Sequence, residues 1–344
     1  QKKFWEDYLQ GFDTQTRLPL KREGVNPDQE GEGAAGEFRF VLEKEVKERL
    51  EDLLKARRVT LASVFYCAWG LLLQRYSDSD DVIFGTTVSG RSAPIYGIEN
   101  MVGLFINTIP LRIAAGPGEK IKDLVERINH FLAIREEYER TSLVDIKEYS
   151  NLENNQELFD SIVVLENYPL DRRWMQENTR LPLLVKSYSI AESTPYPLTV
   201  GITTGEDIEI RLIFDTLRFE GEAFSRLAAH FHVMLTNIFE NFEKGIHSIE
   251  FLTGEEKQRI LTEFNDTAVD FHGDKTIGQL FEEQVERNPD HVALVGSKAE
   301  TKKRRGEEEK QEEVPPGEVT NFGENAAPAL DNCADRFSRP VQPV

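Results

Sequence analysis

The sequence predicts an α/β domain of sandwich type over about its first 250 residues. Two kinds of segment carry this prediction. Residues 82–90 and 208–214 are rich in β-branched residues or alternate apolar with polar residues, as strands do, whereas residues 59–73 and 221–241 have the length and apolar spacing of helices. The chain is 39% hydrophobic and 10% aromatic, which is enough for a core of this size.

The pattern of the N-terminal residues predicts several helices and one strand. An amphipathic helix opens the chain within residues 1–20, and alternation over 38–42 predicts a strand. Residues 43–57 form an exposed helix, and residues 59–73 a buried one with Thr60 near its start. As a helix those fifteen residues span roughly 22 Å, less than the ~30 Å hydrocarbon core, so no membrane span is expected.

The middle of the chain supplies most of the predicted sheet. Pro110 lies in the second candidate strand after the buried helix and predicts an edge or a bend there. Residues 221–241 carry an apolar stripe at three- and four-residue intervals, typical of an amphipathic helix. The remaining predicted elements are strands over 82–90, 101–113 and 158–165, a helix over 120–138, and a hairpin of 197–202 with 208–214.

The composition changes near residue 254. Short helices are predicted over 255–264 and 276–286, joined by a linker. Residues 298–313 are almost all charged, and residues 314–344 have neither a hydrophobic period nor a core. We therefore expect a disordered or aberrant C-terminal tail over 296–344.

Charge and cysteine content exclude several classes of protein. The 41 Lys and Arg against 61 Asp and Glu give a net charge of −20, which argues against binding to nucleic acid or to anionic membranes. Cys67 and Cys333 give neither a metal-ligand spacing nor a disulfide framework, so a cytoplasmic location is expected. The opening residues lack both a Met and an apolar signal region, which suggests a piece of a longer protein.

Catalytic motifs are absent from the residue pattern. His230 and His232 stand two apart on a predicted helix and cannot share a metal, and we expect both at the surface. Neither a glycine-rich phosphate loop nor a G-x-S-x-G elbow occurs. The residues alone therefore predict neither a catalytic group nor a metal site.

Two ordered stretches are more specific. Residues 81–91 read DVIFGTTVSGR, and residues 98–112 read IENMVGLFINTIPLR. They resemble the "DVVFGTTVSGR" strand and the "GxFVNTLPxR" motif in the second half of condensation domains of nonribosomal peptide synthetases. Residues 158–169, LFDSIVVLENYP, are similar to the "PLFDxxxVFENYP" segment of that family.

The resemblance continues toward the C-terminus. Residues 196–202 match the family, residues 251–267 resemble its linker to an adenylation domain, and residues 276–295 resemble the start of that domain. Residues 138–143 depart from the family's "HQDxPFE" motif. The predicted division is a condensation C-terminal lobe over 1–254, a linker over 255–275, the start of an adenylation domain over 276–295, and the tail.

The resemblance implies a fold and a reaction. Such domains are pseudo-dimers of two chloramphenicol-acetyltransferase-like lobes with a tunnel between them, in which an acceptor amine attacks a donor thioester. The substrates arrive on phosphopantetheine arms of peptidyl carrier proteins, and no cofactor is bound directly. The family's catalytic HHxxxDG motif is missing here. We therefore expect the C-terminal lobe alone, inactive without its N-terminal lobe, in a protein that also has an adjacent adenylation domain.

The resemblance also suggests site residues. Candidates for the tunnel lining are Gly103, Phe105, Asn107 and Thr108. Gly103 would allow close backbone approach inside a strand. For Asn107 and Thr108 the alternative is that they only satisfy backbone groups at a bend.

Charged candidates lie on either side of this segment. Arg91 and Arg112 either guide a phosphopantetheine phosphate or form structural ion pairs. Glu166 and Asn167 are expected in a loop at the lobe interface.

Two other functions are open. An epimerisation domain shares the fold, but its usual "FNYLG" motif differs from residues 165–169, LENYP. A non-catalytic module that docks carrier proteins is the other alternative. An isolated C-terminal lobe of a condensation domain should expose an apolar patch, with contributions from residues 103–108 and 158–165.

Overall fold

The computed structural model describes most of the first three quarters of the chain and one later helix. The described residues are 1–20, 35–92, 94–116, 118–152, 156–166, 194–205, 207–268 and 275–289. The predicted tail over 296–344 lies outside them. The chain divides into two units, Gln1–Asn265 and Asp266–Val344, which are described separately.

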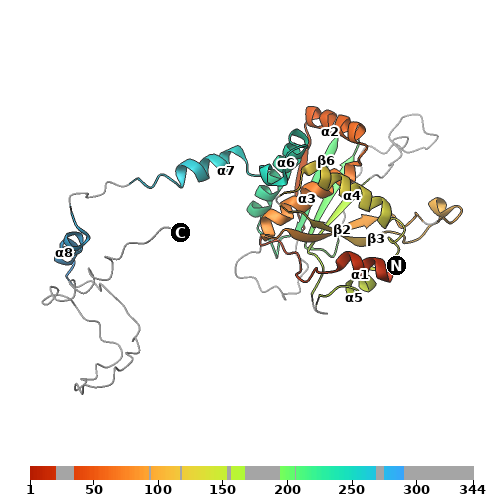
Figure 1. The fold of residues 1–344 in the computed structure, drawn as a ribbon, viewed down its shortest axis with the longest axis horizontal. Coiled ribbons are helices and arrows are strands. Elements are labelled where there is room, and N and C mark those ends of the chain that lie inside the picture. The colour runs from red at the N-terminus through yellow and green to blue at the C-terminus, as the bar shows by residue number, and fades with distance from the viewer. Residues whose placement is uncertain are drawn as a thin grey trace, which may run out of the picture. The chain divides into compact units, whose positions relative to one another are not determined.

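A six-stranded mixed sheet forms the centre of the first unit (Figure 1). Its strand order is β1-β6-β5-β4-β2-β3; the pairs β2–β4 and β4–β5 are parallel, and the other three pairs are antiparallel. The strands are β1 (Ala35–Val41), β2 (Asp81–Val88), β3 (Asn107–Ala114), β4 (Ser161–Glu166), β5 (Leu198–Thr204) and β6 (Ile208–Asp215). The predicted hairpin of residues 197–202 and 208–214 is confirmed as the β5–β6 pair.

Pro110 lies in β3, at one edge of the sheet, as its missing N–H requires. The prediction of a strand over 101–113 is wrong in its first half, because β3 begins only at Asn107. Residues 101–104 are exposed loop that pairs with no strand. Their apolar side chains therefore serve neither the sheet nor the core.

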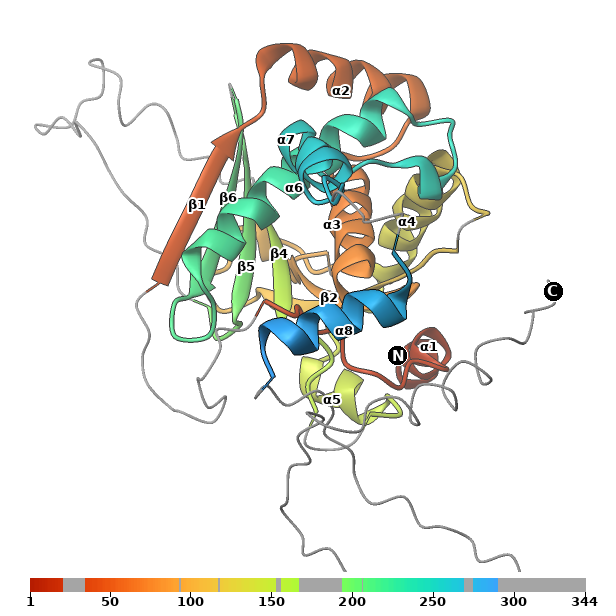
Figure 2. The ribbon, with the colours of Figure 1, turned by 90° about the vertical axis from the view of Figure 1, so that its left-hand side faces the viewer.

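Helices cover both faces of the sheet. They are α1 (Lys2–Leu9), α2 (Lys44–Arg57), α3 (Leu61–Ser77), α4 (Ile121–Arg135), α5 (Leu143–Glu148) and α6 (Gly221–Glu240), with single turns η1 (Ile98–Asn100) and η3 (Ile246–Ser248). Figure 2 shows α3, α4 and α6 together on one face, and Figure 1 shows α1 and α5 side by side near β2 and β3.

Alternation along β2 explains the two layers. Val82 and Phe84 are buried in the cluster under α3 and α6, whereas Ile83 points to the other face and packs with Trp5 of α1 and Ile146 of α5. All of these side chains are essentially inaccessible to water. The smaller cluster under α1 and α5 therefore holds the N-terminal helix against the β2–β3 edge.

The buried helix α3 begins as the sequence predicts. Thr60 is its N-cap, and its hydroxyl accepts a hydrogen bond from the Ser63 amide at 3.3 Å. Twelve of its seventeen residues are buried, Phe65 and Trp69 among them. An all-round apolar helix of this kind is stable only between two layers, here the sheet and its neighbours α4 and α6.

The first unit ends with α7 (Gly254–Gln258) and a π-helical turn, η4 (Arg259–Glu263). The second unit contains α8 (Ile277–Arg287), which Thr276 begins with a capping box to Gln279. In the described part of the chain, no helix combines the length and the apolar character that crossing a membrane requires.

Candidate functional site

Asn107, the first residue of β3, uses its side chain to hold the loop that follows α4. Its Nδ2 donates to the carbonyl oxygens of Glu139 and Thr141, both at 2.8 Å. Its Oδ1 accepts from the Thr108 amide at 3.0 Å. Both amide protons are thus bonded to backbone, so Asn107 positions residues 139–141, the stretch in which this chain departs from the family motif.

A buried polar network lies beneath this contact. Arg135, at the end of α4, is 6% exposed, and its Nη1 donates to Thr86 Oγ1 at 2.7 Å. Burial lowers the pKa of this guanidinium, while Tyr66, Tyr8 and Glu139 act in the opposite direction. An arginine nevertheless stays charged in a protein, so a positive charge lies inside the fold between α3, α4 and β2.

The Glu139 side chain extends this network to the loop after β2. Glu139 is 6% exposed, and one of its carboxylate oxygens accepts a hydrogen bond from the Ser92 hydroxyl. Neither Arg135 nor Glu139 stands out in the sequence, because buried charges cannot be recognised by residue type. The only sequence signal was the unusual motif at residues 138–143.

Gly90, not Gly103, is the glycine that permits close backbone approach. Gly90 has φ +64°, and a Cβ there would lie 2.0 Å from the Phe105 carbonyl oxygen. Gly103 lies in the exposed loop, and a Cβ there would meet only the Phe105 ring, at 3.1 Å or more. The expectation for Gly103 assumed a strand interior, and the late start of β3 removes that setting.

Arg91 lies against Phe105. Its guanidinium carbon is 4.2 Å from the Phe105 ring centroid, and its Nη1 donates to the Ile98 carbonyl. The side chain is therefore held within its own loop, and its charge is partly covered by the aromatic ring.

A cavity of about 370 Å³ opens between these loops. Phe105 and Asn107 line it, whereas Gly103 and Thr108 do not. Its apolar side is formed by Ile95, Ile98, Leu104, Phe105 and Ile106, and its polar side by Asn107, Glu139, Arg140 and Ser142. An apolar wall facing a few polar groups is typical of a site for a small organic group.

Several apolar side chains of these loops are exposed. Among those that line the cavity, Leu104 is 94% exposed and Ile95 and Ile106 are about half exposed. Tyr96 and Val102, in the same stretch of chain, are fully exposed. The predicted contribution of residues 103–108 to an exposed apolar surface is thus present. The predicted contribution of residues 158–165 is wrong, because none of them is exposed: Leu158, Phe159 and Ile162 are buried in the cluster under α1 and α5.

Thr108 lies on β3 opposite Thr87 of β2. Arg112, further along β3, lies at the N-terminal helix. Its Nη2 is 2.6 Å from Asp81 Oδ2, and its Nη1 donates to the carbonyls of Tyr8 and Gln10 at 3.0 and 2.9 Å. The hydrogen bond to Asp81 raises the pKa of Arg112. This guanidinium ties the end of α1 to the sheet.

Glu166 is the last residue of β4, and Asn167 lies outside the described residues. Glu166 Oε1 is 2.6 Å from Arg211 Nη2, and Glu166 Oε2 accepts from Thr203 Oγ1 at 3.0 Å. Both partners of the ion pair are mostly buried on the sheet. Glu166 therefore lies in a strand and not in the predicted loop, and its carboxylate is bonded to Arg211 and Thr203 of the same sheet.

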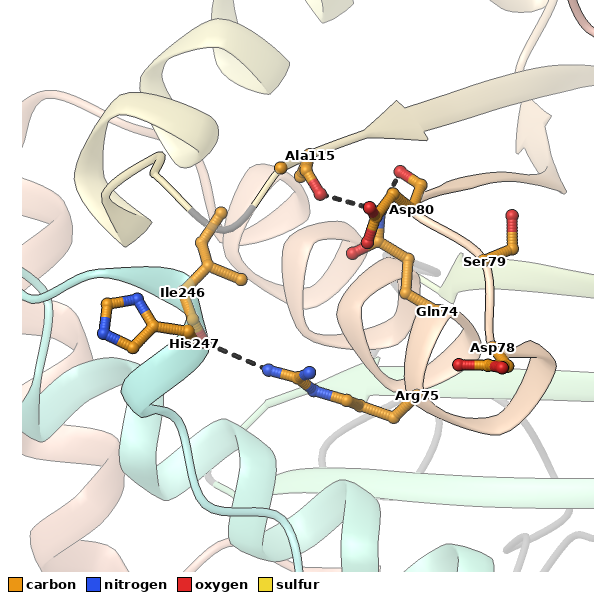
Figure 3. Close-up of a pocket in the computed structure, with 9 residues that line it drawn as sticks. Gln74, Arg75, Asp78, Ser79, Asp80, Ala115, Ile246 and His247 are labelled. Atoms are coloured by element: carbon orange, nitrogen blue, oxygen red, sulfur yellow. Dashed lines mark hydrogen bonds between the residues drawn. The ribbon is translucent and has the colours of Figure 1, made fainter. Parts of the chain in front are cut away.

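A second, polar cavity of about 270 Å³ lies at the end of α3 (Figure 3). Gln74 donates there to the carbonyls of Asp80, Ile113 and Ala115, and Arg75 donates to the Ile246 carbonyl at 3.4 Å. These side chains are bonded to backbone. Within the described ranges, no group of three or more His, Cys, Asp or Glu side chains is placed to hold a metal ion.

Comparison with known proteins identifies the family. The protein-family model of the condensation domain matches residues 1–261 of the sequence. The chain is 33% identical over 296 residues to gramicidin S synthase 2 of Brevibacillus brevis, and 34% identical over 302 residues to bacitracin synthase 3 of Bacillus licheniformis. These matches cover 85% and 87% of this chain, which spans only 6% and 5% of the length of those proteins.

Solved structures show the same fold at low sequence identity. A four-domain nonribosomal peptide synthetase, holo-AB3403, superposes with a TM-score of 0.67 at 15% identity, over 85% of this chain and 23% of that one. The X-domain from teicoplanin biosynthesis gives 0.60 at 19% identity, over 73% and 56%. The predicted chloramphenicol-acetyltransferase-like lobe is thereby confirmed as the fold. The chain belongs to the condensation-domain family of nonribosomal peptide synthetases.

Proposed function

We propose that this chain supplies the C-terminal lobe of a condensation domain, which joins carrier-bound aminoacyl or peptidyl thioesters by acyl transfer. The acceptor amine attacks the donor thioester carbonyl, a C–N bond forms, the C–S bond breaks, and the carrier thiol leaves with a proton. The observation that carries this proposal is the cavity beside Asn107, which is formed by the same "GLFINT" segment that resembles the family motif.

The chain is expected to be inactive by itself. The HHxxxDG motif does not occur in the sequence, and none of the described residues that line the cavity is a histidine. General-base catalysis needs a group within hydrogen-bond reach of the attacking amine. We infer that a separate N-terminal lobe supplies it and that the mostly exposed loop after β2 faces that lobe.

The partners of this lobe are a donor and an acceptor peptidyl carrier protein, whose phosphopantetheine arms bring the substrates. No further cofactor is required for acyl transfer of a thioester. Residues 276–295 then begin an adjacent adenylation domain, after a linker over 255–275. A cytoplasmic location fits the free, buried thiol of Cys67.

Among the predicted site residues, Phe105 and Asn107 are proposed to line the substrate path. Arg91 and Arg112 are proposed as structural, because each is already bonded to groups of this chain. Glu166 is likewise bonded to Arg211.

Mixing separately purified lobes tests the proposal. The chain is combined with an N-terminal lobe that carries HHxxxDG and with two loaded carrier proteins, and dipeptidyl thioester is measured by mass spectrometry. Product is expected only when both lobes are present, and Asn107→Ala should reduce it while Asn100→Ala, at an exposed position outside the cavity lining, should not. Turnover by the chain alone would contradict the proposal. Carrier binding without any product from the pair would favour the docking module instead.

A further inference from the structure

His230 of α6 is buried and bonded on both sides. The residue is 7% exposed, although the sequence predicted it at the surface. Its Nδ1 is 2.7 Å from the Tyr76 hydroxyl at the end of α3, and its Nε2 is 2.7 Å from Glu256 Oε2 in α7. The Phe251 ring packs edge-on against the imidazole. One histidine thus connects three helices, and the acyl-transfer proposal makes no use of it.

The same carboxylate also begins α7. Glu256 Oε2 accepts from the Thr253 amide at 3.0 Å and from the Thr253 hydroxyl at 2.8 Å, while the Glu256 amide donates back to Thr253 Oγ1. This is a capping box. The group that starts the helix is therefore also the group that bonds to the body of the lobe.

Little else holds α7. Neither α7 nor the following turn η4 has a buried residue, and Ile260, Leu261 and Phe264 are 43–62% exposed. The ion pair between Lys257 and Glu250 is half exposed at both ends, and such pairs contribute little to stability. The bond from His230 is thus the main polar contact of α7 with the helices behind it, among the described residues.

The protonation states follow from the partners. Burial acts to raise the pKa of Glu256, but the hydrogen bonds from Thr253 and His230 outweigh it and lower that pKa. Glu256 is therefore an acceptor, and His230 Nε2 carries a proton. Burial raises the pKa of Tyr76 to about 12, so its hydroxyl keeps its proton.

The hydroxyl of Tyr76 is the partner of the other ring nitrogen, Nδ1, and a hydroxyl can donate or accept a hydrogen bond there. The titratable groups that face the ring are Tyr76 from α3 and Glu256 from α7, and Arg226 of α6 acts electrostatically on Tyr76. Both ring nitrogens of His230 therefore have a partner.

We propose that Tyr76, His230 and Glu256 form a docking triad that fixes α7 on the lobe. The consequence is that His230 sets the geometry of the junction between α7 and the helices behind it, since neither α7 nor η4 has a buried residue. This proposal concerns the first unit alone and is independent of the reaction that the lobe supports.

Hydrogen exchange of the full 344-residue chain tests the triad. Peptides covering 253–264 are compared with peptides of α3 in the wild type, in His230→Phe and in His232→Gln. The variant His232→Gln is the control. His232 lies on the same helix and is more exposed, and among the described residues its ring bonds only to the exposed carboxylate of Glu43. We expect His230→Phe to raise exchange of residues 257–263 about tenfold, the effect of one charge-assisted hydrogen bond, with α3 and the control variant unchanged.

Two outcomes would overturn the proposal. Unchanged exchange in His230→Phe would show that α7 is held by other contacts. An equal acceleration of residues 257–263 in His232→Gln would show that the effect does not depend on the triad. If His230→Phe also loosens α3, Glu256→Gln separates the two effects, because Gln preserves the capping box and removes only the charge that faces His230. Faster exchange confined to 257–263 in Glu256→Gln supports the triad, and unchanged exchange contradicts it.

Discussion

The side chain of Asn107 donates a hydrogen bond to the backbone carbonyl of Thr141 at 2.8 Å, across 34 residues of sequence. A second bond from the same nitrogen reaches the Glu139 carbonyl. The start of an edge strand and the loop after α4 are thereby fixed to each other at the rim of the cavity. The shape of the site therefore depends on one amide group.

Replacing Asn107 should destabilise the lobe through its backbone partners. Asn107→Ala leaves two carbonyls without a donor, and we expect a loss of about 1–3 kcal/mol in the free energy of unfolding. Asn107→Asp should cost more, because a carboxylate faces two carbonyl oxygens. Urea denaturation measures both, with exposed Asn100→Ala as a control within about 0.5 kcal/mol of wild type. A stable Asn107→Asp variant would mean that the loop is held by other bonds.

Alanine substitutions at two glycines with positive φ should distinguish the cost of backbone strain from the cost of steric overlap. Gly97→Ala meets only the cost of a left-handed conformation, about 1–2 kcal/mol, since no atom lies within 4 Å of its added Cβ. Gly90→Ala adds a collision with the Phe105 carbonyl at 2.0 Å and should lose about 3 kcal/mol or more. Thermal unfolding of the two variants gives the comparison. Equal losses would show that the Phe105 loop moves aside freely.

The ion pair of Glu166 and Arg211 should behave as a buried pair. Their side chains are 8% and 13% exposed, and the closest atoms are 2.6 Å apart. Arg211→Met leaves a carboxylate uncompensated and should cost about 3–5 kcal/mol. The double variant Glu166→Leu/Arg211→Met should recover much of that loss, because both charges are removed. Chemical denaturation of the three proteins checks this, and additive losses would contradict it.

Acid should weaken the contribution of Glu256 to stability. Hydrogen bonds lower the pKa of this carboxyl in the folded lobe below its ordinary value of 4.5. The contribution is therefore present above that ordinary value and is lost as the pH falls through the folded pKa. The difference in unfolding free energy between wild type and Glu256→Gln should be constant near neutral pH and shrink in acid. A difference in unfolding free energy that grows on acidification would contradict this prediction.

The exposed loop should cause self-association of the isolated chain. Val102 and Leu104 are almost fully exposed beside the cavity, and β3 is an open sheet edge. We expect dimers or larger species in sedimentation velocity, fewer of them after Val102→Lys/Leu104→Lys, and no change after Leu217→Lys, at a separate turn. Co-expression with an N-terminal lobe should also suppress them. A stable monomer at tens of micromolar that binds no hydrophobic dye would show that the exposed loop does not cause self-association.

The sequence by itself determined the family and most of the elements, although not the start of β3 or the short helix α5. Strand alternation, the apolar stripe of residues 221–241 and the cap at Thr60 depend on neighbours within a few residues, so local chemistry is sufficient to predict them. Pro110 likewise indicated an edge strand or a bend, because the missing N–H is a property of the residue itself. The family followed from several motifs in order, which need no knowledge of contacts.

Only the tertiary structure decided the partners of each polar group. The structure shows contacts between parts of the chain that are apart in sequence. Gly90, and not Gly103, approaches the Phe105 backbone, and Arg135 is buried beside Thr86. His230 bonds to Tyr76 and to Glu256. A residue type gives the capacity to donate or accept a hydrogen bond, and the fold chooses the partner. For that reason the sequence located the segment of the site and named Asn107, but it did not find the Arg135 guanidinium or the Glu139 carboxylate beneath it.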